Sequence, residues 1–143
     1  FATYRAAKWI NENGYKDQVS LIVSGKIRTP GDVLKVCALG ADACYIGTIA
    51  LLAVSHSQIE KAIPFEPPTT LTWYDGHYSK SFDIELGAKA LNNFLEACRL
   101  ELIEGIRALG KTSLSQVNHE DLVCIDELIA KGCNIPMVYQ PFN

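Results

Sequence analysis

Two alternating patterns of apolar residues organise the first third of the chain. Residues 2 to 13 carry apolar side chains at helical spacing and end at Asn13-Gly14, where glycine favours the left-handed cap that ends many helices. Val19 to Val23 is a short, almost continuous apolar run, which is typical of a strand buried on both faces. The sequence therefore predicts a helix followed by a buried strand.

A second helix is predicted from the sequence TPGD at positions 29 to 32. Threonine can accept a hydrogen bond from the amide three residues on, proline tolerates the first helical position, and aspartate favours the positive end of the helix dipole. The helical spacing of apolar residues continues as far as Gly40. A second buried strand is predicted at 43 to 46, and a third helix from there to about Val54.

Residues 1 to 54 thus alternate between helix and strand with short connections. No internal repeat or low-complexity segment points to another architecture. This order of elements predicts parallel strands joined by right-handed crossovers, and hence the α/β fold class.

Prolines and aromatic residues interrupt the pattern between 55 and 82. Because proline lacks an amide donor, we expect no regular element around Pro64, Pro67 and Pro68. The segment is expected to lie in extended form on the outside of the fold, with a short strand at Leu71 to Tyr74. Three aromatic side chains are expected to cover that outside rather than to stack on a ligand: Trp73, Tyr74 and Tyr78.

The last part of the chain has helical spacing. Residues 83 to 109 carry a broad apolar stripe, which predicts one long amphipathic helix capped by Gly110 and packed on the rest of the fold, rather than a coiled coil. Residues 112 to 132 are expected to form two short helices, the second of which begins at Asn118.

Composition excludes several classes of function. The net charge of −3 and the pI near 5.6 argue against a nucleic-acid surface, which needs clustered Lys and Arg. The longest apolar stretch, Ile46 to Val54, is far shorter than the roughly 20 residues that span a bilayer. We therefore expect a cytoplasmic protein without a nucleic-acid or membrane partner.

The cysteines and histidines do not have the spacing of a metal site. The five cysteines are scattered and never form a Cys-x-x-Cys pair, so we expect reduced thiols and no disulfide framework. The three histidines are far apart, which predicts surface or capping roles. The residues concerned are Cys37, Cys44, Cys98, Cys124, Cys133, His56, His77 and His119.

Candidate chemistry is concentrated in the two turns that follow the predicted strands. In a parallel α/β unit both turns lie at the carboxyl edge of the sheet, and each exposes backbone N–H groups at a helix start, where an anion is favoured. Glycine at 25 and 47 lets the backbone approach a ligand closely. Arg28 also has an alternative role, the pairing with a neighbouring carboxylate. We predict a cup for a phosphate dianion, formed by Ser24, Gly25, Lys26, Ile27, Arg28, Gly47 and Thr48.

The segment from Ser24 to Thr48, SGKIRTPGDVLKVCALGADACYIGT, closely resembles the FMN-binding domain of the glutamate synthase family. Looser versions of it occur in IMP dehydrogenase and in the 2-hydroxy-acid-oxidising flavoproteins. The resemblance continues in PPTTLTWYDG and LGKTSLSQVNHEDLV, which are similar to the region that follows the barrel in short members of the glutamate synthase family.

The resemblance implies a fold and an activity. Residues 1 to 54 would be the last two βα units of a TIM-type (β/α)8 barrel, and residues 55 to 143 a helical C-terminal extension. The parent protein would be an FMN-dependent oxidoreductase of glutamate biosynthesis that reduces a 2-iminoglutarate-type intermediate, with the predicted cup holding the FMN phosphate. The resemblance assigns no catalytic residue to this chain, and we expect the chain alone to be inactive.

The chain departs from the family in three ways. Lys26 stands where the family usually has a second glycine, so its Cβ would crowd the phosphate if residue 26 needs a positive φ, or its ammonium would bind the phosphate directly. Large glutamate synthases carry a group of cysteines for an iron–sulfur centre soon after the glycine–threonine turn. The corresponding residues 53 to 63 contain no cysteine, so we expect no iron–sulfur cluster in this segment. The six preceding barrel strands are absent. We therefore expect self-association, or a partner that supplies the missing N-terminal barrel segment, because a two-stranded sheet is marginal by itself.

Two other functions stay open at this point. The first is a non-catalytic phosphate- or flavin-binding module, or an assembly module, that keeps the end of the barrel without the chemistry. The second is another phosphate-binding barrel enzyme, such as an IMP dehydrogenase-like protein. The segments PPTTLTWYDG and LGKTSLSQVN favour the glutamate synthase family over the second of these.

Overall fold

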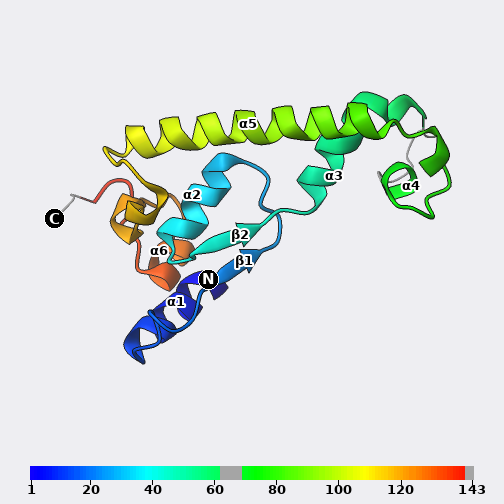
Figure 1. The fold of residues 1–143 in the computed structure, drawn as a ribbon. Helices are drawn as coiled ribbons and strands as arrows, with labels where there is room; N and C mark the ends of the chain where they lie inside the picture. The colour runs from blue at the N-terminus through cyan, green and yellow to red at the C-terminus, as the bar shows by residue number, and fades with distance from the viewer. Residues whose placement is uncertain (62–68, 141–143) are drawn as a thin grey trace. The chain divides into compact units, whose positions relative to one another are not determined.

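Figure 1 shows the chain as a computed structural model, which describes residues 1–61 and 69–140. The chain divides into two compact units. Unit 1 contains Phe1–Tyr45 and Leu102–Asn143, and unit 2 contains Ile46–Glu101. This division follows the packing of the chain and does not test the predicted one, in which residues 1–54 belong to a barrel and residues 55–143 to an extension. The predicted division stays a prediction.

Unit 1 begins with the alternation that the apolar pattern predicts. Its elements are the helices α1 and α2 and the strands β1 and β2, in the order α1 (Ala2–Glu12), β1 (Ile22–Ser24), α2 (Pro30–Ala38) and β2 (Ala43–Tyr45). The two strands pair in parallel, with Ile22 opposite Ala43 and Ser24 opposite Tyr45. The predicted helix–strand–helix–strand order and the parallel pairing are confirmed, although both strands are shorter than expected.

Local chemistry fixes the ends of α2. Thr29 is its N-cap and Pro30 its first residue, and the side chains of Thr29 and Asp32 exchange hydrogen bonds with each other's backbone amides in a capping box. Gly40 follows the helix with φ at +101°. A Cβ on Gly40 would lie 2.5 Å from the Cβ of Ala7, so glycine also lets this turn approach α1 closely.

The sheet is much more open than the apolar runs predict. Ile22 is 46% exposed and Tyr45 is 65% exposed, and neither β1 nor β2 contains a buried residue. The expectation of strands buried on both faces is therefore wrong for the described residues. The physical reason is that only two strands pair here, so that an edge of each strand stays unpaired within the described part of the chain.

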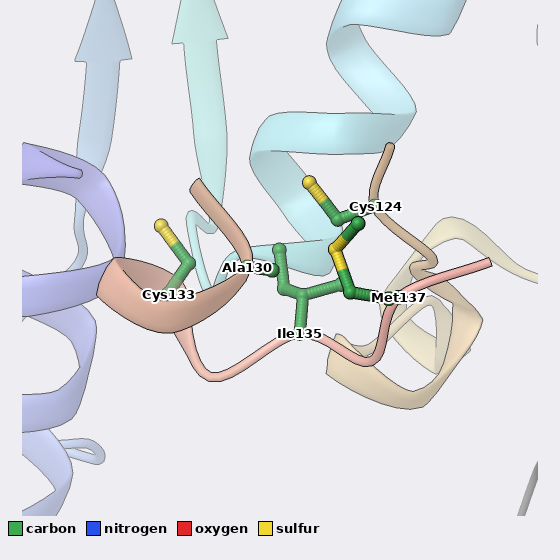
Figure 2. Packing of buried hydrophobic residues seen from close by; sticks show 5 residues of the cluster. All are labelled: Cys124, Ala130, Cys133, Ile135 and Met137. Atoms are coloured by element: carbon green, nitrogen blue, oxygen red, sulfur yellow. The ribbon is translucent and has the colours of Figure 1, made fainter. Parts of the chain in front are cut away.

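The rest of unit 1 is a short-element segment after the long helix α5 (Ile84–Ala108). It contains the 3₁₀ turns η3 (Leu114–Gln116) and η4 (His119–Asp121) and then α6 (Glu127–Cys133). The prediction of two short helices is thus corrected, since the Asn118 start opens only a 3₁₀ turn and the α-helix lies further on. Figure 2 shows five residues of the apolar cluster around α6, which are Cys124, Ala130, Cys133, Ile135 and Met137.

Unit 2 is built from short helices and the first part of α5. Its other elements are α3 (Thr48–Ser55), η1 (His56–Lys61), α4 (Thr69–Thr72) and η2 (Ser79–Ser81). The predicted strand at Leu71 to Tyr74 is wrong, because Leu71 belongs to α4 and is only 1% exposed. The predictions made for Pro64, Pro67 and Pro68 lie outside the described residues.

Gln58 holds the start of α5 within unit 2. Its side chain is fully buried and donates to the carbonyl oxygen of Asp83 at 2.8 Å, while the amide of Asp83 donates to its Oε1 at 2.7 Å. A few residues further on, a Cβ on Gly87 would lie 2.5 Å from the ring of Phe82, so α5 packs closely at this glycine. Both contacts fix the first turn of the long helix.

The long helix confirms the prediction for 83 to 109 in position and length, with 25 residues. Its predicted apolar stripe is covered only in part, since Ile84 is 76% exposed and Leu95 is 45% exposed. At its other end, a Cβ on Gly105 would lie 2.7 Å from Cδ1 of Leu34, so α5 approaches α2 closely within unit 1. No helix in the described residues is both long and apolar enough to cross a membrane.

Lys111 and Asp121 form a largely enclosed ion pair after α5. Their side chains are 17% and 13% exposed, and the Lys111 ammonium also donates to the carbonyl of Gln116 at 2.7 Å. The carboxylate of Asp121 accepts from the amide of Asn118 at 2.8 Å. Burial raises the pKa of Asp121, but the hydrogen bonds from Lys111 and Asn118 and the charge of Lys111 together bring it below its ordinary value.

This pair predicts an acid-sensitive stability. A carboxyl group whose pKa is lowered by folding stabilises the fold above its unfolded pKa of about 4 and loses that contribution as the pH falls through the folded value. Asp121→Asn should therefore flatten the loss of stability below about pH 4 and lower the free energy of unfolding at neutral pH by about 1–2 kcal/mol. Urea unfolding at several pH values measures both. The exposed pair Glu127–Lys131 provides the control, since Glu127→Gln should change little. An unchanged acid limb in Asp121→Asn would contradict this account.

Candidate functional site

The predicted site residues lie in two turns, one in each unit. Ser24 is the last residue of β1, and Gly25 to Arg28 connect it to α2 in unit 1. Gly47 is the N-cap of α3 and Thr48 its first residue, both in unit 2. We describe each turn by itself and define the phosphate turn as residues 24 to 28.

The phosphate turn has a left-handed backbone at two consecutive positions. φ is +117° at Gly25 and +57° at Lys26. A non-glycine residue with positive φ is uncommon and costs about 1–2 kcal/mol relative to its ordinary conformations. The sequence left open whether residue 26 needs a positive φ, and it does. Lys26 therefore occupies a position that favours glycine.

One residue anchors the phosphate turn while its neighbours face outward. Ile27 is only 8% exposed and belongs to the buried residues of the chain. Ser24, Gly25, Lys26 and Arg28 are all exposed. The buried side chain of Ile27 therefore anchors the turn, and its other residues are exposed at the carboxyl end of β1.

Asp32 already occupies part of the predicted cup. Its Oδ2 accepts hydrogen bonds from the backbone amides of Arg28 and Thr29, both at 3.1 Å. The hydrogen bond from the Arg28 amide is the largest influence on the pKa of Asp32 and lowers it; burial raises it, but further hydrogen bonds with Thr29 and the charge of Lys35 leave it below its ordinary value. A carboxylate thus lies at the positive end of α2, where the sequence led us to expect free amides.

The donors that remain lie earlier in the turn. The N–H groups of Lys26 and Ile27 make no hydrogen bond with residues that the structure describes. The side chains of Lys26 and Arg28 enter no ion pair within residues 1–61 and 69–140, so the alternative that Arg28 pairs with a carboxylate has no support there. One exposed turn thus contains two amides without an acceptor and two cations without an ion pair among the described residues, a composition that suits an anion with several oxygens.

The second turn also leaves amides available. α3 begins at Gly47 without a side-chain cap, and the amides of Thr48 and Ile49 have no acceptor among the described residues, whereas the amide of Ala50 donates to the carbonyl oxygen of Gly47 at 3.0 Å. φ at Gly47 is −128°, and a Cβ there would meet nothing within 4 Å. Within the described residues, neither the backbone conformation nor the packing requires a glycine at position 47. A ligand that approaches the backbone closely would require one.

Two hollows lie in unit 1. The larger of them, with a volume of about 960 Å³, is lined chiefly by residues of α1, by residues 37 to 42, by residues 114 and 115 and by residues 117 to 119. The other surrounds α6 and the segment after it. Neither is lined by a predicted site residue. The phosphate turn is therefore an exposed part of unit 1 that lines neither of these hollows.

The histidines and cysteines have local structural surroundings. Nε2 of His119 lies 2.8 Å from the carbonyl oxygen of Cys133, and the ring of His77 contacts that of Tyr78 edge-on. All five cysteines carry free thiols, as expected from their spacing. Burial raises the pKa of the Cys37 thiol, so that this residue is an apolar packing group rather than a nucleophile.

Sequence reasoning missed the second role of Asp32. The spacing TPGD was read only as a helix start, although the same spacing places the carboxylate within reach of the two amides before the helix. A capping box directly after a glycine-containing turn is therefore a signal that the acidic residue of the box can use the last amides of that turn.

A family model and several known proteins that resemble this chain all carry the name glutamate synthase. Residues 1–112 match the family model described as the conserved region in glutamate synthase. The chain is 35% identical over 108 residues to an archaeal-type glutamate synthase (NADPH) of Dehalococcoides mccartyi, covering 76% of this chain and 22% of that protein. It is 32% identical over 108 residues to an archaeal glutamate synthase (NADPH) of Methanocaldococcus jannaschii, covering 76% and 21%.

A third relative matches beyond the family region. The chain is 30% identical over 148 aligned residues to a glutamate synthase large subunit-like protein of Rhizobium meliloti, covering 92% of this chain and 34% of that protein. The chain thus spans between about a fifth and a third of the length of these relatives. No solved structure matches it significantly.

The left-handed backbone predicts how the phosphate turn responds to substitution. Gly25→Ala should lower the free energy of unfolding by about 1–3 kcal/mol, because a Cβ is strained at this φ although it has open space around it. Lys26→Gly should raise it by at most about 1 kcal/mol. Gly31→Ala, at a helical glycine of α2 with ordinary Cβ contacts, is the control and should not destabilise. Urea unfolding measures all three, and a Gly25→Ala protein as stable as the parent would show that the turn is not left-handed.

Proposed function

This chain belongs to the glutamate synthase family, and from that membership we propose that it supplies the FMN phosphate-binding turns of a glutamate synthase-like oxidoreductase. The family match agrees with the resemblance of residues 24 to 48 to glutamate synthase. The FMN role and the (β/α)8 barrel are the proposed part. The observation that carries the proposal is the phosphate turn itself, with its free amides at Lys26 and Ile27.

The donors of the phosphate turn fit a phosphate monoester. Such a group carries up to two negative charges and three terminal oxygens, so it binds best where several amides and cations converge. The amides of Lys26 and Ile27, the hydroxyl of Ser24 and the side chain of Arg28 provide these. The uncapped start of α3, at Gly47 and Thr48, is the second donor group of the proposal and rests on the resemblance.

The proposed chemistry follows from what the family does. FMN, when bound, supplies the redox chemistry that reduces an imine to an amine, the step that makes glutamate in the parent protein. This chain would hold the phosphate end of the cofactor and so fix its position. No residue of the chain is proposed as catalytic, because the phosphate lies at the far end of the cofactor from its reacting ring.

The proposed architecture is the end of a barrel. The parallel pair β1 and β2 with the crossover α2 has the arrangement of two successive βα units, and (β/α)8 barrels often bind phosphate after their last two strands. The remaining strands would belong to another part of a longer protein, as the greater lengths of the relatives suggest. Two of these relatives are named as NADPH enzymes, and NADPH is our proposal for the source of electrons.

Binding of FMN to the purified chain tests the proposal. We expect FMN to bind more tightly than riboflavin, which lacks the phosphate, in a titration followed by flavin fluorescence. Arg28→Ala should weaken FMN binding by about fivefold to tenfold and leave riboflavin unchanged, because the lost contact is to the phosphate. Arg5→Ala removes another exposed arginine, on α1, that makes no ion pair within residues 1–61 and 69–140, and should change neither affinity.

Two substitutions at Lys26 separate charge from crowding. Lys26→Met removes the ammonium and keeps the Cβ, whereas Lys26→Gly removes both. If the ammonium binds the phosphate, as we expect, both variants weaken FMN binding by about threefold to tenfold. Tighter binding by Lys26→Gly alone would support crowding instead. No preference for FMN over riboflavin, together with no effect of Arg28→Ala, would refute the phosphate site.

The open sheet predicts a partner. β1 and β2 have unpaired edges within the described residues, and Ile22, Tyr45 and Val19 expose 46%, 65% and 48% of their surfaces. Unpaired strand edges with apolar side chains promote association. We expect the chain to self-associate unless the segment that covers this sheet in a longer relative is present.

Sedimentation velocity over a range of concentrations measures this association. We expect the sedimentation coefficient to rise with concentration. Ile22→Lys places a charge on the sheet and should reduce that rise. Ile84→Lys, at an exposed apolar position of α5, is the matched control and should leave the rise unchanged. A stable monomer at all concentrations would contradict the prediction.

A further inference from the structure

A carboxylate in the first turn of α2 binds the end of the phosphate turn. Oδ2 of Asp32 accepts from the amides of Arg28 and Thr29, both at 3.1 Å, and the amide of Asp32 donates to Oγ1 of Thr29 at 3.2 Å. These three hydrogen bonds occupy the amides of Arg28, Thr29 and Asp32 at the N-terminus of α2, whereas the amide of Gly31 has no acceptor among the described residues. Most of the donors at this helix start are therefore already in use, and a negative charge lies beside them.

A second anion is excluded from the same place. Like charges a few ångströms apart repel each other, and the amides of Arg28 and Thr29 have no further proton to donate. Lys35 lies 4.0 Å from Oδ1 of Asp32, so its charge is directed to that carboxylate. The phosphate turn offers a different set of donors upstream, the amides of Lys26 and Ile27, flanked by the unpaired side chains of Lys26 and Arg28.

We propose that Asp32 is a positioning residue of the phosphate turn, which keeps the FMN phosphate off the N-terminus of α2 and directs it to the amides of Lys26 and Ile27. This inference rests on the proposed function. Asp32 does not touch the phosphate in this arrangement. It acts through the amides of Arg28 and Thr29, which it holds, and through its charge, which closes the helix end to a second anion.

Two variants separate the hydrogen bonds of Asp32 from its charge. Asp32→Asn keeps an oxygen that can accept from both amides but removes the negative charge, so FMN should bind about threefold to tenfold more tightly at the same amides. Asp32→Ala removes both, so the amides of Arg28 and Thr29 become available and the phosphate contact should spread to them. A purely structural role predicts something else, namely weaker binding in both variants without any change in the responding amides.

Backbone amide NMR of the full chain reads out which donors respond. FMN is titrated into the ¹⁵N-labelled parent, Asp32→Asn and Asp32→Ala proteins, with riboflavin as the phosphate-free ligand. Asp126→Asn is the matched control, because Asp126 caps α6 in the same unit through a hydrogen bond from the Ile129 amide at 2.9 Å. This control should bind FMN like the parent.

We expect FMN to shift the amides of Lys26 and Ile27 in the parent and to leave those of Arg28 and Thr29 in place. A response of Arg28 and Thr29 in the parent as large as that of Lys26, or no tighter binding in Asp32→Asn, would overturn the role of Asp32 while the proposed function stands. If FMN shifts no amide of the turn in any of the three proteins, the proposed function is wrong and the role of Asp32 falls with it. If Asp32→Ala loses the spectrum of a folded protein, the FMN affinity and the responding amides of Asp32→Asn, which keeps the cap, decide the role of Asp32.

Discussion

The parallel pairing of β1 with β2 is the constraint on which unit 1 depends. Parallel strands cannot be joined by a tight turn, so the chain must return through a crossover, which α2 provides. Because Ser24 pairs with Tyr45, both strands end at the same edge of the sheet. The phosphate turn leaves the sheet at that edge, and the capping box of α2 holds its other end. The turn is therefore fixed at both ends, and its left-handed backbone is kept between them.

The parts of the fold that local chemistry determines were predictable from the sequence. The TPGD start of α2, the glycine after α1 and the long apolar spacing of α5 all predicted elements that the structure contains. The helical turn α4 was not predictable, because its four residues are too few to show a helical spacing of apolar positions and it packs against α3 and η2, which no local pattern reveals. Burial of the sheet on both faces was predicted wrongly for a related reason. An apolar run shows that a surface needs a cover, but not whether the described residues provide it.

The turn that contains the candidate site residues was predictable from the sequence, but its backbone and its hydrogen bonds were not. The sequence predicted a turn from Ser24 to Thr29 and indicated an unusual lysine at 26, but the positive φ of Lys26 is a property of the folded turn. The carboxylate of Asp32 changes the site more, because it removes the amides of Arg28 and Thr29 from the donors that a phosphate can use. Family membership then supports our proposal that the turn binds a cofactor phosphate, a step that geometry alone does not provide.

The central claim is that the phosphate of FMN is what this turn binds, and the phosphorus atom itself reports on it. ³¹P NMR of FMN in the presence of the purified chain is therefore the most direct measurement. Contact with amides and an arginine should shift and broaden the phosphorus resonance, and Arg28→Ala should return it toward that of free FMN. A phosphorus resonance that the chain leaves unchanged, while the flavin ring still shows binding, would contradict the account, because the chain would then recognise another part of the molecule.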